Sequence, residues 1–197
     1  MVNFVSSKIL TGIGSIESIR AYIMNLQKAR SLKESIYLTD FSLEDIINKI
    51  ILDNQPISAE KEISISLKGD FSAMIRSDRT ILQNHIFPNL ISNAIKFSPM
   101  GEKIEIWGDQ VNGCAQIRIV NKGEKISESA MKSNLDGYIT ESSRGTKGEK
   151  GHGFGLLITK IMTDSIKAEL KLENLPDGKI AVTIKIPLAE KTLKLAS

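Results

Sequence analysis

The sequence predicts a two-layer α/β sandwich, in which helices cover one face of a mixed, mostly antiparallel sheet. Several short segments alternate apolar and polar residues, which is typical of strands that have one buried face and one wet face. Longer segments carry apolar residues at helical spacing. The order along the chain is helix, strands, helix, strands, long loop, helix and hairpin, and this order fits a two-layer sandwich with a mixed sheet.

Length and composition exclude several classes of protein. The chain has 197 residues, of which 41% are apolar, with one cysteine and a net charge of +3. One domain of about 150 residues with an appendage fits this length. The charge is too small to indicate nucleic-acid binding, no apolar run could span a membrane, and the single Cys114 points to a reducing compartment. We therefore expect a cytoplasmic chain without nucleic-acid or membrane contacts.

Residues 2–26 carry a heptad pattern with apolar residues at alternating spacings of three and four. Its members are Val2, Val5, Ile9, Gly12, Ile16, Ile19, Ile23 and Leu26. The pattern predicts a long, coiled-coil-like N-terminal helix. Two interpretations stay open, an amphipathic helix packed on its own domain and a helix that dimerises in a bundle, and the strict spacing favours the second. We place the appendage at residues 1–37, the globular domain at 38–188 and a tail at 189–197.

The first half of the globular domain is predicted from start signals and periodicity. The expected elements are a connector over 29–41, a helix that a capping box at 42–45 opens and Pro56 ends, strands over 62–67 and 73–76, and a long helix over 78–97 with Pro88 as its irregularity. The strand over 62–67 alternates strictly in polarity, so it is expected to have one buried face.

The second half is predicted to hold most of the sheet. The expected elements are strands over 103–107 and 115–120, a loop over 121–152, a helix with its apolar face at Phe154, Leu157, Ile158 and Ile161, a strand at Leu170 and Leu172, a turn at 176–178, and a last strand over 180–186. The long loop is rich in glycine, and loops of this length are usually functional or mobile.

Three polar residues of the long helix, Asn89, Asn93 and Lys96, fall on one face at about 100° per residue. Asparagine is a poor helix former, so two of them in mid-helix need an explanation. A solvated face is the plain alternative. The functional interpretation is that amide oxygens ligate a divalent cation while the lysine meets a phosphate.

Residues 145–155, with the sequence GTKGEKGHGFG, lead directly into a predicted helix. Glycines allow backbone amides to turn inward, and a helix N-terminus presents free N–H groups, so this segment suits a polyphosphate. Arg144, Lys147 and Lys150 add positive charge. The segment is neither a Walker loop nor a dinucleotide-binding fingerprint, and a flexible hinge is the alternative.

Together these segments resemble the motifs of sensor histidine kinases. Residues 89–98, NLISNAIKFS, are similar to the N box of that family, residues 151–156, GHGFGL, to its second glycine box, and residues 144–150 to its lid. The resemblance covers about residues 38–188. It implies the Bergerat fold and a catalytic domain that binds Mg-ATP and transfers the γ-phosphate in line to a histidine.

The resemblance also implies roles for individual residues. Asn93 would ligate Mg²⁺ with support from Asn89, Lys96 would reach phosphate oxygens, Phe97 would lie near the adenine or ribose, and Arg144 would touch the γ-phosphate. Asn89, Lys96 and Arg144 are thus the expected catalytic residues. The expected ATP-binding residues are Asn89, Asn93, Lys96, Phe97, Asn121, Gly123, Ile126, Lys147, Lys150, Gly151, His152, Gly153, Phe154, Gly155 and Leu156.

The chain departs from the family in the box that reads adenine. The family pattern Asp-x-Gly-x-Gly is NKGEK here, from Asn121 to Lys125. An amide oxygen accepts a hydrogen bond without the aspartate's charge, a loss of about 1 kcal/mol. That corresponds to roughly five- to tenfold in affinity. Lys125 replaces a glycine, and a positive φ there would cost about another 1 kcal/mol or reshape the loop.

Two further departures concern the lid and the phosphoacceptor. The family's lid phenylalanine is absent, with Leu135 and Tyr138 as the nearest candidates, and neither His85 nor His152 lies in a His-Glu acceptor motif. Residues 2–30 resemble the second helix of the family's dimerisation hairpin. The expected partners are therefore ATP, a domain that supplies the acceptor histidine, a response regulator, and a second copy through the N-terminal helix.

Three functions stay open from the sequence. The first is an enzyme module with histidine kinase activity, which the departures from the family's motifs would weaken or remove. The second is a degenerate kinase-like domain that serves as a non-catalytic interaction or phosphotransfer scaffold. The third is a serine kinase of the anti-sigma-factor type, against which the heptad helix argues.

Overall fold

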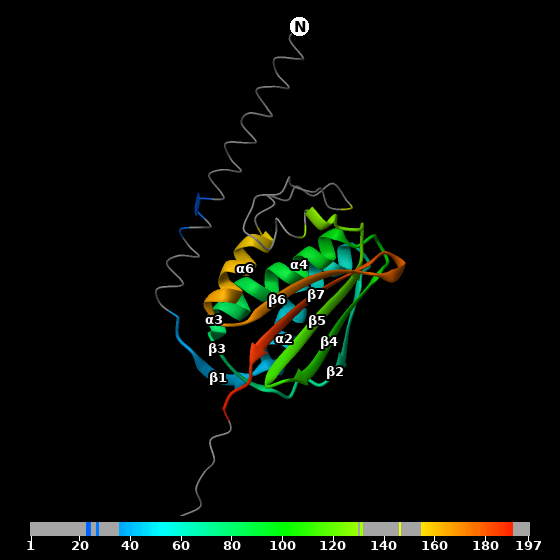
Figure 1. Ribbon diagram of the computed structural model, residues 1–197. Coiled ribbons are helices and arrows are strands. Elements are labelled where there is room, and N and C mark those ends of the chain that lie inside the picture. The colour runs from blue at the N-terminus through cyan, green and yellow to red at the C-terminus, as the bar shows by residue number, and fades with distance from the viewer. Residues whose placement is uncertain are drawn as a thin grey trace, which may run out of the picture.

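The computed structural model describes residues 23, 24, 27, 36–129, 131, 146 and 155–190. Figure 1 shows the arrangement of the helices and strands within these residues. The elements are β1 (Thr39–Ser42), α2 (Leu43–Glu60), β2 (Ser64–Gly69), β3 (Met74–Ser77), α3 (Arg79–Ile81), η1 (Leu82–Ile86), α4 (Phe87–Phe97), β4 (Lys103–Val111), β5 (Cys114–Lys122), α6 (Gly155–Ser165), β6 (Glu169–Leu175), η2 (Pro176–Gly178) and β7 (Lys179–Pro187).

The predicted mixed, mostly antiparallel sheet is confirmed. Five strands lie in the order β2-β4-β5-β7-β6, and a separate two-stranded sheet pairs β1 with β3. Only β2 and β4 run parallel, whereas β4–β5, β5–β7 and β6–β7 are antiparallel. The predicted turn over 176–178 joins β6 to β7 as η2, with Asp177 at φ 61°.

Helices α2, α4 and α6 cover one face of the five-stranded sheet (Figure 1). The core between the layers is filled mainly by isoleucine, because only 5% of the chain is aromatic. The strand side chains turned into this core alternate as predicted, since successive residues of a strand point to opposite faces. They include Ile104, Ile106, Ile117, Ile119, Ile184 and Ile186, all fully buried.

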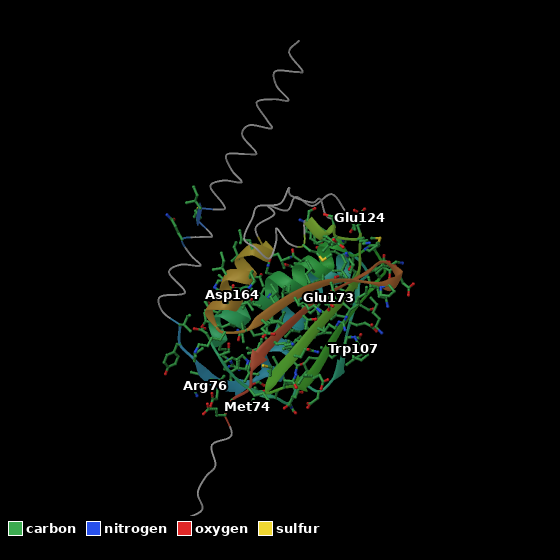
Figure 2. All side chains as sticks on the ribbon, viewed as in Figure 1. Met74, Arg76, Trp107, Glu124, Asp164 and Glu173 are labelled. Carbon is green, nitrogen blue, oxygen red and sulfur yellow. The ribbon has the colours of Figure 1, made fainter. Side chains whose placement is uncertain are left out.

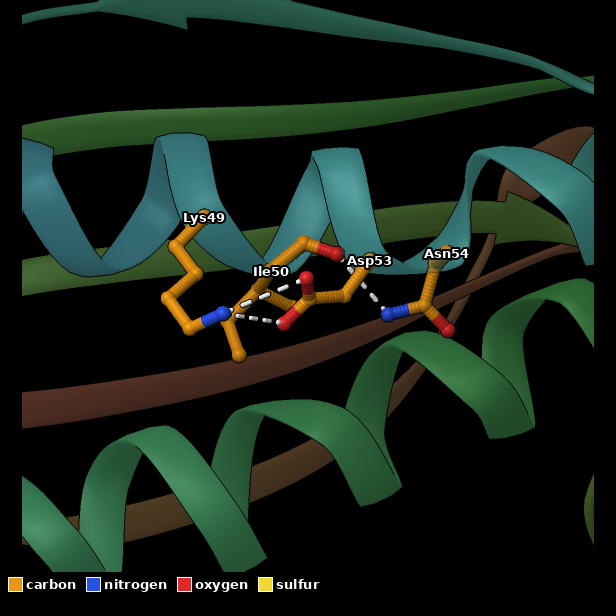
Figure 3. Close-up of polar contacts among 4 residues, drawn as sticks. All are labelled: Lys49, Ile50, Asp53 and Asn54. Atoms are coloured by element: carbon orange, nitrogen blue, oxygen red, sulfur yellow. Dashed lines mark hydrogen bonds and ion pairs between the residues drawn. The ribbon is translucent and has the colours of Figure 1, made fainter.

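Helix α2 corrects two predictions. The helix continues through Pro56 to Glu60, and Ser42 occupies the N-cap without a side-chain cap hydrogen bond, so the predicted end and capping box were wrong. A proline inside a helix cannot donate to the carbonyl four residues earlier. Two contacts support the turn before it: the Asn54 Nδ2 donates to the Ile50 carbonyl at 2.8 Å, and Lys49 pairs with Asp53 at 3.0 Å (Figure 3).

The long helix predicted over 78–97 is interrupted by a π-helical turn. In η1 the N–H of Phe87 donates to the carbonyl of Leu82, five residues earlier. Pro88, which follows directly, has no N–H and its ring crowds the carbonyl four residues before it, so the helix widens there. Asp78 accepts from the Ile81 N–H at 3.0 Å and caps the start.

Two loop predictions were wrong at their ends. Residues 39–41 belong to β1 rather than to a connector, and Phe41 is the one apolar residue in that strand. At the other loop, β5 extends to Lys122, and residues 128, 129 and 131 are helical. Of the heptad residues the structure describes Ile23 alone, whose side chain is 49% exposed, and the remainder lie outside the described residues. None of the described helices combines the length and hydropathy needed to cross a membrane.

Candidate functional site

Helix α4 presents one half-buried stripe that carries Asn89, Asn93, Lys96 and Phe97. The opposite face of the helix is fully buried and consists of Phe87, Leu90, Ile91, Ala94 and Ile95. The four residues of the stripe thus share a side that the core does not cover, as the sequence predicted for Asn89, Asn93 and Lys96. At a rise of 1.5 Å per residue, the stripe is about 12 Å long.

At one end of the stripe, Asn89 bridges α4 to the first residue of α6. Its Nδ2 donates to the hydroxyl of Thr159, and that hydroxyl donates to the Gly155 carbonyl at 2.9 Å. Thr159 is 1% exposed, so this chain of hydrogen bonds is shielded from water. A Cβ on Gly155 would lie 2.5 Å from the Asn89 Oδ1, closer than any real contact. Glycine at this position therefore lets the two motifs meet.

In the middle of the stripe lies Asn93. Within the described part of the chain, its side-chain amide makes no hydrogen bond, although the residue is half-buried. The same part of the chain holds no group of three or more His, Cys, Asp or Glu residues that could bind a metal by itself. An amide oxygen is a suitable ligand for Mg²⁺, which takes oxygen ligands and is usually held by few protein groups plus substrate phosphates.

At the other end of the stripe, a buried lysine that sequence reasoning missed closes α4. The Lys61 Nζ donates to the carbonyls of Ile95 at 2.9 Å and Lys96 at 2.8 Å, and to the Thr146 hydroxyl at 2.7 Å. Lys61 is 3% exposed. A cation here satisfies carbonyls that lack helical partners and opposes the negative end of the helix dipole.

Thr146 is held against the same helix end. Its N–H donates to the Lys96 carbonyl at 3.2 Å and its hydroxyl to the Ser98 carbonyl at 2.8 Å. This residue belongs to the glycine-rich segment singled out in the sequence. The structure thereby brings one described residue of that segment next to Lys96, whose Nζ lies 4.9 Å from the centre of the Phe97 ring.

The end of β5 meets the C-terminal end of α4 at Gly123. A Cβ on Gly123 would lie 3.3 Å from the Phe97 carbonyl oxygen and 3.4 Å from the Asn121 Nδ2. Asn121 is 5% exposed, and its Nδ2 donates to the Lys122 carbonyl at 3.0 Å. Lys125 does not adopt a positive φ. The expected strain at Lys125 is therefore absent, and the loop is built on ordinary backbone angles.

The charged groups with shifted pKa values lie away from this stripe. The pKa of Glu105 is lowered chiefly by a hydrogen bond from Lys68, and that of Glu173 chiefly by one from Lys171. The pKa of Asp70 is lowered by the side chain and backbone of Ser72. Glu105 and Glu173 lie on strands of the sheet, where Figure 2 labels Glu173, and Asp70 directly follows β2. Among the described residues, the groups with lowered pKa values therefore belong to ion pairs and turns of the scaffold.

Seven of the predicted site residues lie outside the described residues: Arg144, Lys147, Lys150, Gly151, His152, Gly153 and Phe154. Leu135 and Tyr138 do as well. Leu156, also predicted for the site, is half-buried and packs against the core. His85 lies in η1 and is half-buried. The described site is thus the N-box stripe with Gly155 at one end and the Asn121–Gly123 strand end at the other.

Known proteins resemble this chain in sequence and in fold. A family model described as histidine kinase-, DNA gyrase B-, and HSP90-like ATPase matches residues 78–190. The chain is 28% identical over 159 residues to the autoinducer 2 sensor kinase/phosphatase LuxQ of Vibrio vulnificus, covering 77% of this chain and 18% of that protein. It is 29% identical over 179 residues to the swarming motility regulation sensor protein RssA of Serratia marcescens, covering 89% and 37%. The chain therefore spans well under half the length of these relatives.

Solved structures share the fold. The nucleotide-free catalytic domain of histidine kinase ThkA superposes with a TM-score of 0.66 at 20% identity, covering 77% of this chain and 95% of that one. Full-length ShkA in complex with AMPPNP gives a TM-score of 0.70 at 17% identity, covering 95% and 38%. The predicted two-layer fold is thus the fold of these catalytic domains.

Proposed function

Because this chain belongs to the family of histidine kinase-, DNA gyrase B-, and HSP90-like ATPases, we propose that it binds Mg-ATP as the catalytic domain of a sensor histidine kinase. The observation that carries this proposal is the stripe on α4. There Asn93, whose amide makes no hydrogen bond within the described residues, lies between Asn89, which contacts Gly155, and Lys96. This combination suits a nucleotide that brings its own metal-bridging phosphates.

Each described residue of the stripe has a role in binding. The Asn93 amide oxygen would hold Mg²⁺, and the bound ion would neutralise charge on the phosphate oxygens. Lys96 would face the phosphates, because it lies on the same face of α4 as Asn93. Asn89 would hold the start of α6 in place through Thr159 and Gly155. Phe97 and Asn121 would lie near the base end.

The remaining predicted roles fall on the glycine-rich segment. Arg144, Lys147 and Lys150 would supply charge near the transferred phosphate, and Gly151, His152, Gly153 and Phe154 would offer backbone amides ahead of α6. Thr146 supports this proposal, because it ties the segment to the carbonyl of Lys96 at 3.2 Å. Catalysis would then rest on positioning and charge neutralisation rather than on covalent participation.

The acceptor histidine is proposed to come from outside the described residues. His85 is half-buried within η1, and Ile86 follows it in place of the glutamate of a His-Glu acceptor motif. We therefore propose that the γ-phosphate passes to a histidine on another domain, and from there to a response regulator. The heptad helix would join two copies, and the chain would act in the cytoplasm.

A second candidate function is a non-catalytic scaffold, and the residue that motivates it is Asn121. Asn121 lacks the charge of the family's aspartate, so the hydrogen bond that its Oδ1 can accept from adenine is weaker. A chain that never binds nucleotide could keep this fold for partner binding alone. The scaffold predicts no phosphoryl transfer under any condition.

Phosphoryl transfer in trans distinguishes these functions. The full chain is mixed with γ-labelled Mg-ATP and a separately prepared dimerisation domain that carries a His-Glu acceptor motif. The kinase proposal predicts label on that domain that is lost in acid and stable in alkali, as expected for phosphohistidine. Acid-stable label would indicate the serine kinase instead, and a lack of label with several acceptor domains would favour the scaffold.

A further inference from the structure

Asn174 holds the loop that follows β5 by two hydrogen bonds to a single residue. The Ile126 N–H donates to the Asn174 Oδ1 at 3.0 Å, and the Asn174 Nδ2 donates to the Ile126 carbonyl at 2.7 Å. The side-chain amide of asparagine has an acceptor oxygen and a donor nitrogen side by side. It can therefore pair with the backbone N–H and C=O of one residue, as the backbone of a neighbouring strand does. The side chain of Asn174 thus extends the sheet to a loop that has no strand of its own.

The sequence around Asn174 contains a signal for this role. Leu170, Leu172 and Asn174 lie on the same face of β6, and the two leucines are buried. An asparagine that continues a buried apolar row must find hydrogen-bond partners, because an unpaired buried amide is costly. Ile126 supplies both partners.

The position of Asn174 in the sheet connects it with the base end of the site. Ile180 of β7 is the register partner of Asn121 in β5 and also of Asn174 in β6. The three residues therefore form one cross-strand row on the helix-covered face, with the two asparagines about 10 Å apart. Gly123 lies over this row, since a Cβ there would meet the Ile180 Cδ1 at 3.2 Å.

The loop is attached to the β6–β7 hairpin at a second point as well. The Gly123 N–H donates to the Gly178 carbonyl at 2.9 Å. Gly178 fixes the start of the loop through the backbone, whereas Asn174 fixes its middle through a side chain. Only the second attachment depends on residue identity, so Asn174 determines where Ile126 lies.

We propose that Asn174 is a positioning residue for recognition of the nucleotide base. By holding Ile126, Asn174 sets the position of the Asn121–Ile126 loop, and this position sets the preference for adenine over guanine. The inference rests on the proposed nucleotide-binding function and deepens it. Within the described part of the chain, both side-chain hydrogen bonds of Asn174 go to Ile126 and none to the α4 stripe, where the phosphates would bind. Its removal should therefore affect recognition of the base and leave recognition of the phosphates intact.

The test compares the full chain with Asn174→Ala and with Asn84→Ala, which changes an exposed asparagine of η1. Dissociation constants for Mg-ATP, Mg-ADP and Mg-GTP are measured by calorimetry, and melting temperatures are recorded without nucleotide. We expect Asn174→Ala to lower the affinities for ATP and for ADP by the same factor, about five- to tenfold, because two hydrogen bonds that position the loop are lost. The affinity for GTP should change little, so the ratio of ATP affinity to GTP affinity falls. Asn84→Ala should leave all dissociation constants and the melting temperature unchanged.

A second variant guards against simple unfolding. Asn174→Asp keeps an acceptor for the Ile126 N–H but loses the donor and places a carboxylate near the Ile126 carbonyl, so it should lower the ATP:GTP ratio as well. A fall in melting temperature with an unchanged ratio in both variants would overturn the inference, because it would indicate a structural role alone. A larger loss for ATP than for ADP would also overturn it. Failure of the unsubstituted chain to bind any nucleotide would instead contradict the proposed function, and this inference with it.

Discussion

The Asn89 Oδ1 lies so close to the backbone of Gly155 that a Cβ on the glycine would be only 2.5 Å away. This contact joins the helix that carries the predicted metal ligand to the helix that follows the glycine-rich segment. The two sequence motifs meet through it, although Asn89 and Gly155 are 66 positions apart along the chain. The Asn89–Thr159 hydrogen bond fixes the orientation of the amide at the junction.

Gly155→Ala should therefore destabilise the protein. Alanine in place of glycine within a helix normally stabilises by roughly 0.5–1 kcal/mol, so the sign of the change is informative. The clash with Asn89 predicts a loss of about 1–3 kcal/mol in the free energy of unfolding. Urea denaturation measures it. The double variant Asn89→Ala/Gly155→Ala should recover much of the loss, and a stabilising Gly155→Ala on its own would contradict the contact.

Asn121→Asp should raise affinity for Mg-ATP about five- to tenfold, because a carboxylate makes a charged hydrogen bond with the adenine amino group. The same change should lower the melting temperature of the free protein. Asn121 is 5% exposed, and the aspartate would lose the hydrogen bond to the Lys122 carbonyl. Calorimetry and melting curves check both effects. Equal affinity for the two proteins would show that the missing charge does not limit binding.

Lys61→Met should destabilise the fold by about 2–4 kcal/mol, because the Ile95 carbonyl, the Lys96 carbonyl and the Thr146 hydroxyl each lose the hydrogen bond from the lysine. Lys49→Met is the matched control on α2. Lys49 is exposed and its ion pair with Asp53 contributes little, so that variant should change stability by no more than about 0.5 kcal/mol. Similar small effects for both substitutions would contradict the role of Lys61 as the cap of α4.

Acid should weaken the sheet through Glu105. Its pKa is held below the ordinary 4.5 chiefly by the hydrogen bond from Lys68. A carboxyl whose pKa is lower in the folded state adds stability that is complete above its unfolded pKa and is lost as the pH falls through the folded value. The loss should therefore begin near pH 4.5 and continue below it. Glu105→Gln should flatten the dependence of unfolding free energy on pH in that range, and an unchanged slope would exclude this pair as a cause.

The sequence was sufficient for the sheet and the α4 stripe, because both follow from local periodicity. Alternation placed Ile104, Ile106, Ile117 and Ile119 in the core, and helical spacing put Asn89, Asn93 and Lys96 on one side. Contacts between distant residues could not be derived in this way. Lys61 and Ile95 are 34 positions apart, and Asn174 and Ile126 are 48 apart. Only the fold brings these pairs together.

Local signals also misled where tertiary contacts outweighed them. Pro56 is a strong helix breaker, yet α2 continues past it to Glu60, with Asn54 and Ser58 buried on either side of the proline and the Asn54 Nδ2 bonded to the Ile50 carbonyl. The strand β1 was missed because its only apolar residue is Phe41. Its pairing with β3, rather than its own composition, makes it a strand.

The most direct test of the central claim is a calorimetric titration of the full chain with ATP, in the presence and absence of magnesium. The account predicts saturable binding at one site with magnesium and a rise in melting temperature that follows ligand concentration. Removal of magnesium with a chelator should weaken binding, and Asn93→Ala should abolish the difference between the two conditions while Asn84→Ala preserves it. No heat of binding and no change in melting temperature at millimolar Mg-ATP would contradict the assignment of a nucleotide site to the α4 stripe.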